Sequence, residues 1–167
     1  LDSKDNIIEG LRNEADDYVS KPFNLEVLLQ KIDTLIKNRI RLKNKFLLQS
    51  GNDQELKMSN SLDEDFITQI TKFIIDNISD PELSVPDLCK LSRMSRTSFY
   101  HKIKSLIDLT PNEFIRTVRI KRAKAIMVNN PNLNISEVAY MTGFSDPKYF
   151  STLFKKYFEQ SPSDYIK

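Results

Sequence analysis

The feature that most constrains this chain is an internal repeat in its C-terminal part, because a duplicated segment has to fold twice into the same unit. The stretch LSVPDLCKLSRMSRTSFYHKIKSLIDLTPNEFIR begins at Leu83, and its pattern returns from Leu133 in LNISEVAYMTGFSDPKYFSTLFKKYFEQSPSDYIK. The copies align at an offset of 50 residues up to Ser95 and Ser145, and at 51 residues from Phe99 onward. Two copies are too few for a solenoid, so the repeat predicts a duplicated functional unit.

Each copy has the pattern of a helix-turn-helix. Capping pairs mark the start of a short first helix: Ser84 with Asp87, and Asn134 with Glu137. A turn of three to four residues follows, and we expect second helices to start at Ser95 and Ser145. The units are therefore predicted at about 84–107 and 134–158.

The two second helices carry a buried stripe on one face and polar side chains on the other. The expected stripes are Phe99, Ile103, Leu106 and Ile107, and Phe150, Phe154, Tyr157 and Phe158. A major groove about 12 Å wide admits one helix of this kind. The residues predicted to read base edges are Thr97, Tyr100 and His101 in the first copy, and Lys148, Ser151 and Thr152 in the second. For any one of these residues, an ordinary solvated surface is the alternative.

Basic residues gather between Lys90 and Lys124, where ten Lys and Arg face two acidic residues. Such a run is usually a solvated face, but a local excess this large favours a polyanionic partner. The candidate phosphate contacts are Arg96, Lys102, Lys104, Arg116, Arg119, Arg122 and Lys155. A helix from about Asn112 to Asn129, with an apolar stripe at Phe114, Val118, Ala125 and Val128, is predicted to hold the units about one DNA turn apart, roughly 34 Å.

From about Leu62 to Lys167 the chain resembles the DNA-binding domain of the AraC/XylS family of bacterial transcription regulators. The segment NISEVAYMTGFSDPKYFSTLFKKYF, followed by SPSDY, carries this resemblance most specifically. It implies seven helices, with the second helix of each unit in adjacent major grooves of double-stranded DNA. The family usually has glycine where this chain has Asp108 and Glu159, which puts the corner geometry in question. The predicted fold class is mainly all-α: two tandem helix-turn-helix units joined by a linker helix.

The N-terminal string ADDYVSKPFNLEVLLQKI resembles the last third of a response-regulator receiver domain. The resemblance implies a helix, a strand and a long helix within residues 1–48, before a linker at 49–61. It also implies that Lys21 is the lysine that contacts a phosphorylated aspartate, and that Tyr18 is a switch side chain. The aspartate itself is missing, so we expect no phosphorylation of this segment. The junction predicts a hybrid two-component phosphorelay protein whose full-length form carries histidine kinase activity, and the apolar faces of residues 1–45 predict a homodimer.

Other classes fit less well. His101 and Cys89 are the only histidine and cysteine and form no plausible dyad, and no phosphate loop or metal-ligand spacing is present. We therefore expect no enzyme, no catalytic residue, no cofactor, no metal and no small-molecule site in this fragment. A protein-binding adaptor stays open, and RNA is less natural because a stacking platform is missing. RNA polymerase is a further candidate partner. The single cysteine and the lack of a long apolar run predict a cytoplasmic location, with the parent anchored in the inner membrane.

Overall fold

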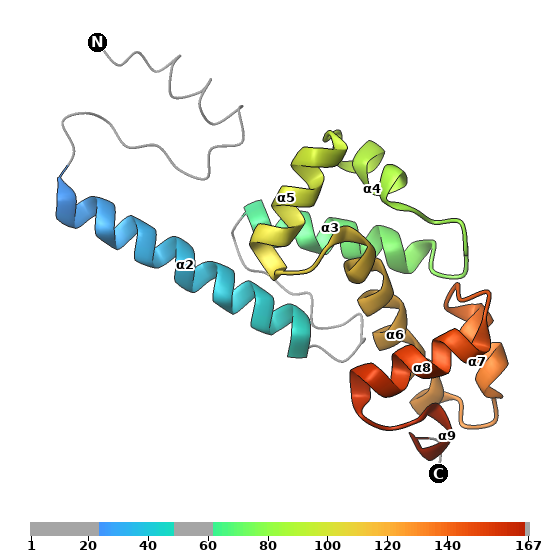
Figure 1. Ribbon diagram of the computed structural model, residues 1–167. Helices are drawn as coiled ribbons and strands as arrows, with labels where there is room; N and C mark the ends of the chain where they lie inside the picture. Colours follow the sequence, from blue (N-terminus) through green and yellow to red (C-terminus); the bar gives the residue numbers. More distant parts are fainter. Residues whose placement is uncertain (1–23, 49–61, 166–167) are drawn as a thin grey trace. The chain divides into compact units, whose positions relative to one another are not determined.

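The computed structural model describes residues 24–48 and 62–165, and all regular secondary structure there is α-helical (Figure 1). The mainly all-α prediction is confirmed for these residues. The predicted helix and strand of the receiver-like segment, with Tyr18 and Lys21, lie outside the described residues. The chain divides into two compact units, Leu1–Ile40 and Arg41–Lys167. None of the described helices is long and apolar enough to cross a membrane.

Helix α2, Leu25–Leu48, begins as the sequence predicts. The Asn24 side-chain oxygen accepts a hydrogen bond from the Glu26 amide at 2.8 Å, which caps the first turn. Large apolar side chains recur along the helix every three or four residues with 44–63% of their surface exposed: Leu25, Leu29, Ile32, Ile36 and Ile40. The part of α2 that belongs to the first unit, up to Ile40, therefore presents an apolar stripe.

Between residues 62 and 165, the second unit has the seven helices that the resemblance implies. They are α3 Leu62–Asp76, α4 Val85–Ser92, α5 Arg96–Ile107, α6 Pro111–Asn129, α7 Ile135–Met141, α8 Pro147–Phe158 and α9 Pro162–Tyr165. Figure 1 shows α6 running from the group α3–α5 to the group α7–α9. The capping pairs are also present, since the carboxylates of Asp87 and Glu137 accept hydrogen bonds from the amides of Ser84 and Asn134.

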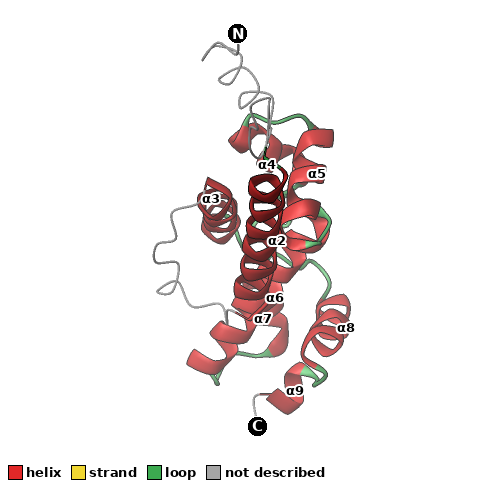
Figure 2. Cartoon of the chain, turned by 90° about the vertical axis from the view of Figure 1, so that its left-hand side faces the viewer, coloured by secondary structure: helices red, strands yellow, loops and turns green. Residues whose placement is uncertain are grey.

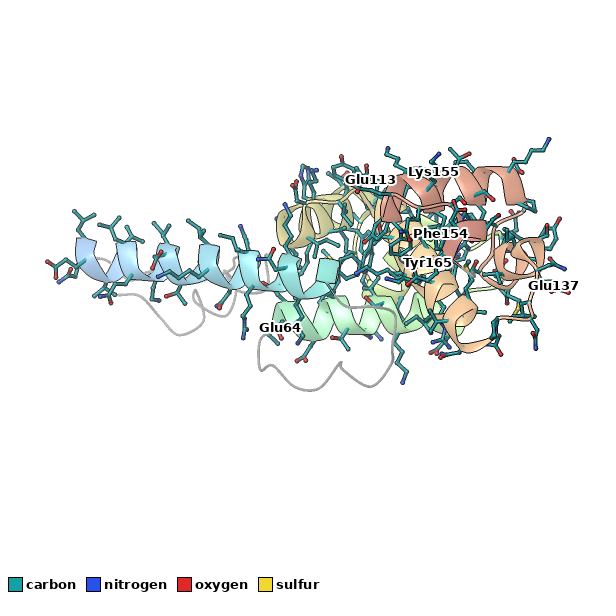
Figure 3. The ribbon with its side chains drawn as sticks, turned by 90° about the horizontal axis from the view of Figure 1, so that it is seen from below. Glu64, Glu113, Glu137, Phe154, Lys155 and Tyr165 are labelled. Carbon is teal, nitrogen blue, oxygen red and sulfur yellow. The ribbon has the colours of Figure 1, made fainter. Side chains whose placement is uncertain are left out.

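Helix α6 contributes to two separate hydrophobic cores. Phe114, Ile115 and Val118 belong to the first core, with α3, α4 and α5, while Ile120, Ala123 and Met127 belong to the second, with α7 and α8. Figure 3 labels Phe154 and Tyr165 of the second core, whose ring centroids lie 5.8 Å apart. The predicted single stripe of α6 was wrong beyond Val118: Val128 is 61% exposed because the buried face changes where the second core begins.

The last turns of α2 belong to the first core. Leu42 and Phe46 are buried, and the Phe46 ring lies 4.9 Å from that of Phe114. The Lys121 ammonium group donates to the Phe46 carbonyl and lies 4.7 Å from its ring centre. Burial lowers the pKa of Lys121 to about 8. The compact unit that contains α3 to α9 thus begins at Arg41, within α2.

The two corners without glycine keep the left-handed conformation. Asp108 ends α5 with φ 60°, and Glu159 ends α8 with φ 61°. Asp108 also pairs with Lys104 at 2.9 Å and Lys43 at 3.0 Å, and these two ammonium groups lower the pKa of its carboxyl to about 2. Both corners therefore hold a residue with a side chain in the left-handed region.

The start of α8 differs from the prediction. Asp146, not Ser145, is the N-cap: its carboxylate accepts from the Lys148 amide at 2.8 Å, and Pro147 opens the helix. Ser95 caps α5 as predicted, accepting from the Ser98 amide at 3.1 Å. The residue added in the second copy therefore lies in its turn, which moves the cap by one position.

The corner at Glu159 predicts a stabilising substitution. A left-handed residue with a Cβ costs roughly 1–2 kcal/mol, and glycine loses about 0.5–1 kcal/mol in chain entropy, so Glu159→Gly should raise the free energy of unfolding by ~0.5–1 kcal/mol. Urea denaturation measures this difference. Glu159→Ala keeps the Cβ and serves as the control, with no comparable gain. A Gly variant no more stable than the Ala variant would contradict the strain argument.

Candidate nucleic-acid interface

Helices α5 and α8 present matching exposed faces. Residues 97, 100, 101 and 104 of α5 correspond to residues 148, 151, 152 and 155 of α8, each pair 51 positions apart. Both sets lie opposite the buried stripe of their helix, in which Phe99 and Phe150 are fully buried. The repeat therefore produces two equivalent polar surfaces on equivalent frames.

The six side chains predicted to contact bases differ in their solvent exposure and in their hydrogen bonds. Thr97, Tyr100, His101, Lys148 and Thr152 are exposed. Ser151 is half-buried, and its hydroxyl donates to the Pro147 carbonyl at 2.9 Å. The Thr152 hydroxyl donates to the Lys148 carbonyl at 3.0 Å. The Tyr100 and His101 rings meet edge to face, with centroids 5.9 Å apart, which orders this part of α5.

The two helices lie on the same side of the second unit. In Figure 2, α5 and α8 are both to the right of α6, whereas α3 and α7 are to its left. A surface that carries α5 and α8 together can face one partner with both helices. The geometry therefore suits an extended ligand rather than a compact one.

The predicted basic contacts separate into two groups. Arg96, Lys104, Arg116 and Lys155 are exposed, and Arg122 is half-buried. Lys104 donates to the Asp108 carbonyl at 2.9 Å, and its hydrogen bond with Asp108 raises its pKa. Lys102 instead lies on the side of α5 toward α3, 3.5 Å from the Asp63 carboxylate and 5.0 Å from the centre of the Phe66 ring. The structure does not bring Lys102 together with the predicted reading residues.

Arg119 requires a correction. It was expected on an exposed basic face, but only 7% of its surface is accessible. Its guanidinium group donates to the Gly143 carbonyl at 2.8 Å and to the Asp80 carbonyl at 2.6 Å. Burial lowers the pKa of this group. Turn carbonyls hold Arg119 inside the protein, so it is not available to a phosphate.

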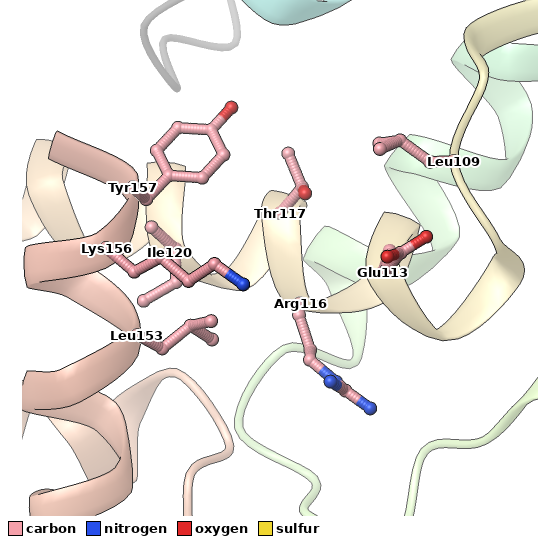
Figure 4. A pocket seen from close by; sticks show the side chains of 8 residues that line it. All are labelled: Leu109, Glu113, Arg116, Thr117, Ile120, Leu153, Lys156 and Tyr157. Carbon is pink, nitrogen blue, oxygen red and sulfur yellow. The ribbon is translucent and has the colours of Figure 1, made fainter.

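A hollow of about 280 Å³ separates α6 from α8 (Figure 4). Its lining is Leu109, Glu113, Arg116, Thr117, Ile120, Leu153, Lys156 and Tyr157. Glu113 is engaged in capping α6, since it accepts from the Thr110 amide at 2.7 Å, and this bond lowers the pKa of its carboxyl. Arg116 and Lys156 place positive charge at the hollow.

Lys156, which also lines the hollow, is not among the phosphate contacts predicted from the sequence. The corresponding residue of the first copy is Ser105, so the repeat gave no reason to select this lysine. Its importance depends on the packing of α8 against α6, which only the tertiary structure provides. Among the described residues, no cluster of His, Cys, Asp and Glu is arranged to hold a metal ion.

Two tandem helix-turn-helix units on one linker helix define a DNA-binding class of protein. A family model described as a helix-turn-helix domain matches residues 88–167. The chain is 39% identical over 158 residues to histidine kinase P4 of Formosa agariphila, which covers 94% of this chain and 11% of that protein. It is 37% identical over 112 residues to the Msm operon regulatory protein of Streptococcus mutans, covering 67% and 40%.

A solved structure has the same fold. It is a transcriptional regulator from Chromobacterium violaceum with an AraC-type DNA-binding domain, 21% identical, with a TM-score of 0.57 over 62% of this chain and 90% of that one. The chain thus carries a tandem helix-turn-helix domain with the fold of AraC-type DNA-binding domains. The chain spans 11% of the length of histidine kinase P4 and 40% of the length of the Msm operon regulatory protein.

Proposed function

We propose that this chain binds specific double-stranded DNA sequences by placing α5 and α8 in two successive major grooves. The matched exposed faces of α5 and α8 carry this proposal. Thr97, Tyr100 and His101 would contact bases from α5, while Lys148, Ser151 and Thr152 would do so from α8. Hydroxyl, imidazole and ammonium groups provide donors and acceptors that suit the edges of bases.

Phosphate contacts would supply affinity and register. The candidates are Arg96, Lys104, Arg116, Arg122 and Lys155, joined by Lys156. Between two major grooves on one side of a duplex lies a minor groove edged by phosphates, and Arg116 and Lys156 stand at the hollow between α6 and α8. Lys104 is 45% exposed in its pair with Asp108, and exposed ion pairs are weak in water, so a phosphate can replace the carboxylate at small cost.

The domain would be the output part of a hybrid two-component protein. The similarity to histidine kinase P4 extends over 94% of this chain and so includes residues outside the helix-turn-helix domain. Lys21 and Tyr18 fit the receiver-like reading of those residues. The exposed stripe of α2 supports a homodimer, and RNA polymerase is a further candidate partner of a bound regulator.

Binding to duplex DNA across a salt series tests the proposal. Six to eight phosphate contacts predict a log–log slope of roughly −5 to −7, and Lys155→Ala should reduce its magnitude by about 1 on every sequence. Lys72→Ala on α3 removes the same charge from the other side of the unit and should leave the slope unchanged. Absence of binding even at low salt would instead favour a protein-binding adaptor.

Base reading is tested by selecting preferred sequences from random duplexes. His101→Ala should relax the preference in one half of the site and Lys148→Ala in the other, by about 1–3 kcal/mol for each affected base pair. Ser105→Ala lies on α5 outside the matched face and is the control. If both variants keep the base preferences of the unchanged chain, His101 and Lys148 do not contact bases.

Dimerisation is tested by light scattering at high protein concentration. We expect a mass twice the 19.5 kDa of one chain, because the stripe on α2 is apolar and exposed. Leu29→Glu combined with Ile36→Glu should return the mass to 19.5 kDa, while Asn38→Glu on the opposite side of α2 should not. A monomeric mass for the unchanged chain would disprove the dimer.

A further inference from the structure

Arg119 lies at the junction of the two hydrophobic cores. On α6, Val118 is the last residue of the first core and Ile120 begins the second. Helices α7 and α8 pack mainly on α6 and on each other, and α3–α5 do the same on the other part of α6. The position of α7 and α8 relative to α3, α4 and α5 is therefore set by α6 and by any direct contact between the two groups of helices.

The Arg119 guanidinium group makes such a joint. One nitrogen donates to the carbonyl of Asp80, in the connection from α3 to α4, and the other donates to the carbonyl of Gly143, in the turn before α8. Both bonds are short, at 2.6 and 2.8 Å, and the side chain is 7% exposed. An arginine stays charged under such burial, and hydrogen bonds from a buried charged group are costly to lose. One side chain thus ties the α3–α4 connection, which leads into the first helix-turn-helix unit, to the turn of the second helix-turn-helix unit.

Gly143 allows the two halves to come this close. Its φ is +75°, and a Cβ at this position would collide with the carbonyl oxygen of Ile78 and would lie 2.8 Å from the Arg119 Cζ. The turn of the second helix-turn-helix unit therefore lies directly against the α3–α4 connection, which leads into the first helix-turn-helix unit. Any side chain at position 143 would push these segments apart.

We infer that Arg119 and Gly143 form a lock that fixes α8 relative to α5, and thereby sets the base-pair spacing that the two units accept. The lock acts on position and makes no contact with DNA. Adding one base pair between two half-contacts shifts them by about 3.4 Å and rotates them by roughly 34°. A locked pair of helices cannot follow this change, whereas a pair joined only through α6 can. The inference rests on the proposed reading of two successive grooves.

The test measures affinity for the selected DNA site and for versions with one base pair inserted or deleted between its halves. For the unchanged chain, the spacing variants should bind at least ~10-fold more weakly. Arg119→Met should lower this penalty to about 3-fold or less, because the units can then move apart. Gly143→Ala should have the same effect through the other partner. Lys124→Met removes a charge elsewhere on α6 and should leave the penalty intact.

Unfolding curves identify the variants that fold. If Arg119→Met does not fold, Arg119→Lys, which keeps the charge but cannot bridge both carbonyls in the same way, replaces it beside Gly143→Ala. A merely structural role would weaken binding to every spacing alike and leave the ratio unchanged. Folded variants at both positions that retain the full spacing penalty would overturn the lock.

A measurement without DNA separates failure of the lock from failure of the proposed function. Spin labels at Ser105→Cys on α5 and Ser136→Cys on α7, in a Cys89→Ser background, report the distance distribution between the two units by pulsed electron resonance. Arg119→Met should broaden this distribution and Lys124→Met should not. An equally narrow distribution in all three proteins would overturn the lock, whatever the DNA experiments give.

Discussion

The structure of the second unit depends on one helix burying two different faces. At about 100° per residue, Phe114 and Val118 point to one side of α6, and Ala123 and Met127 point to nearly the opposite side. Each side completes the core of one helix-turn-helix unit, and neither short α4 nor short α7 has enough apolar surface to hold its partner helix alone. The two units are thus built around α6, and the polar faces of α5 and α8 are placed by how their buried stripes dock there.

The end of α2 is tied to the first core by charge as well as by apolar contact. Glu64 is buried, and its carboxylate lies 2.7 Å from Arg41 and 3.5 Å from Lys45. A buried carboxylate is expensive without such partners, so the ion pairs of Glu64 with Arg41 and Lys45 help to hold the last turns of α2 on the first core. The C-terminal turn of α2 carries carbonyls without intrahelical partners, and Lys121 satisfies one of them at Phe46. This helix end is therefore part of the DNA-binding unit, although it precedes the linker.

Local rules recovered most of the fold from the sequence. Asn24, Ser84, Ser95 and Asn134 all stand where their helices begin, because capping is decided by neighbouring residues. The apolar periodicity placed both reading helices for the same reason. Asp146 was missed because the second copy has an extra residue just before its cap, and the two copies cannot show which of two polar residues takes that role.

Long-range contacts explain the remaining errors. Basic residues on a helix are expected in solvent, and nothing near Arg119 in the sequence shows that carbonyls 39 residues before it and 24 residues after it will surround its guanidinium group. Lys102 stays a predicted phosphate contact, but its pairing with Asp63 of α3 could not be derived from the sequence. Lys156 was passed over because its neighbour across the hollow lies on another helix. Charges are thus the residues whose roles sequence reasoning predicts least well.

A rigid frame changes what two weak reading helices can achieve together. Once one reading helix is bound, the second faces its half-site at a high effective concentration. In a rigid frame, no affinity is lost to ordering a flexible connection between the two helices. The same rigidity raises the penalty for sites with the wrong spacing. Sequence selectivity in such a domain therefore comes from the buried contacts that hold the units together as well as from the side chains that touch bases. On the proposed lock, a buried arginine between two cores influences selectivity without touching the DNA.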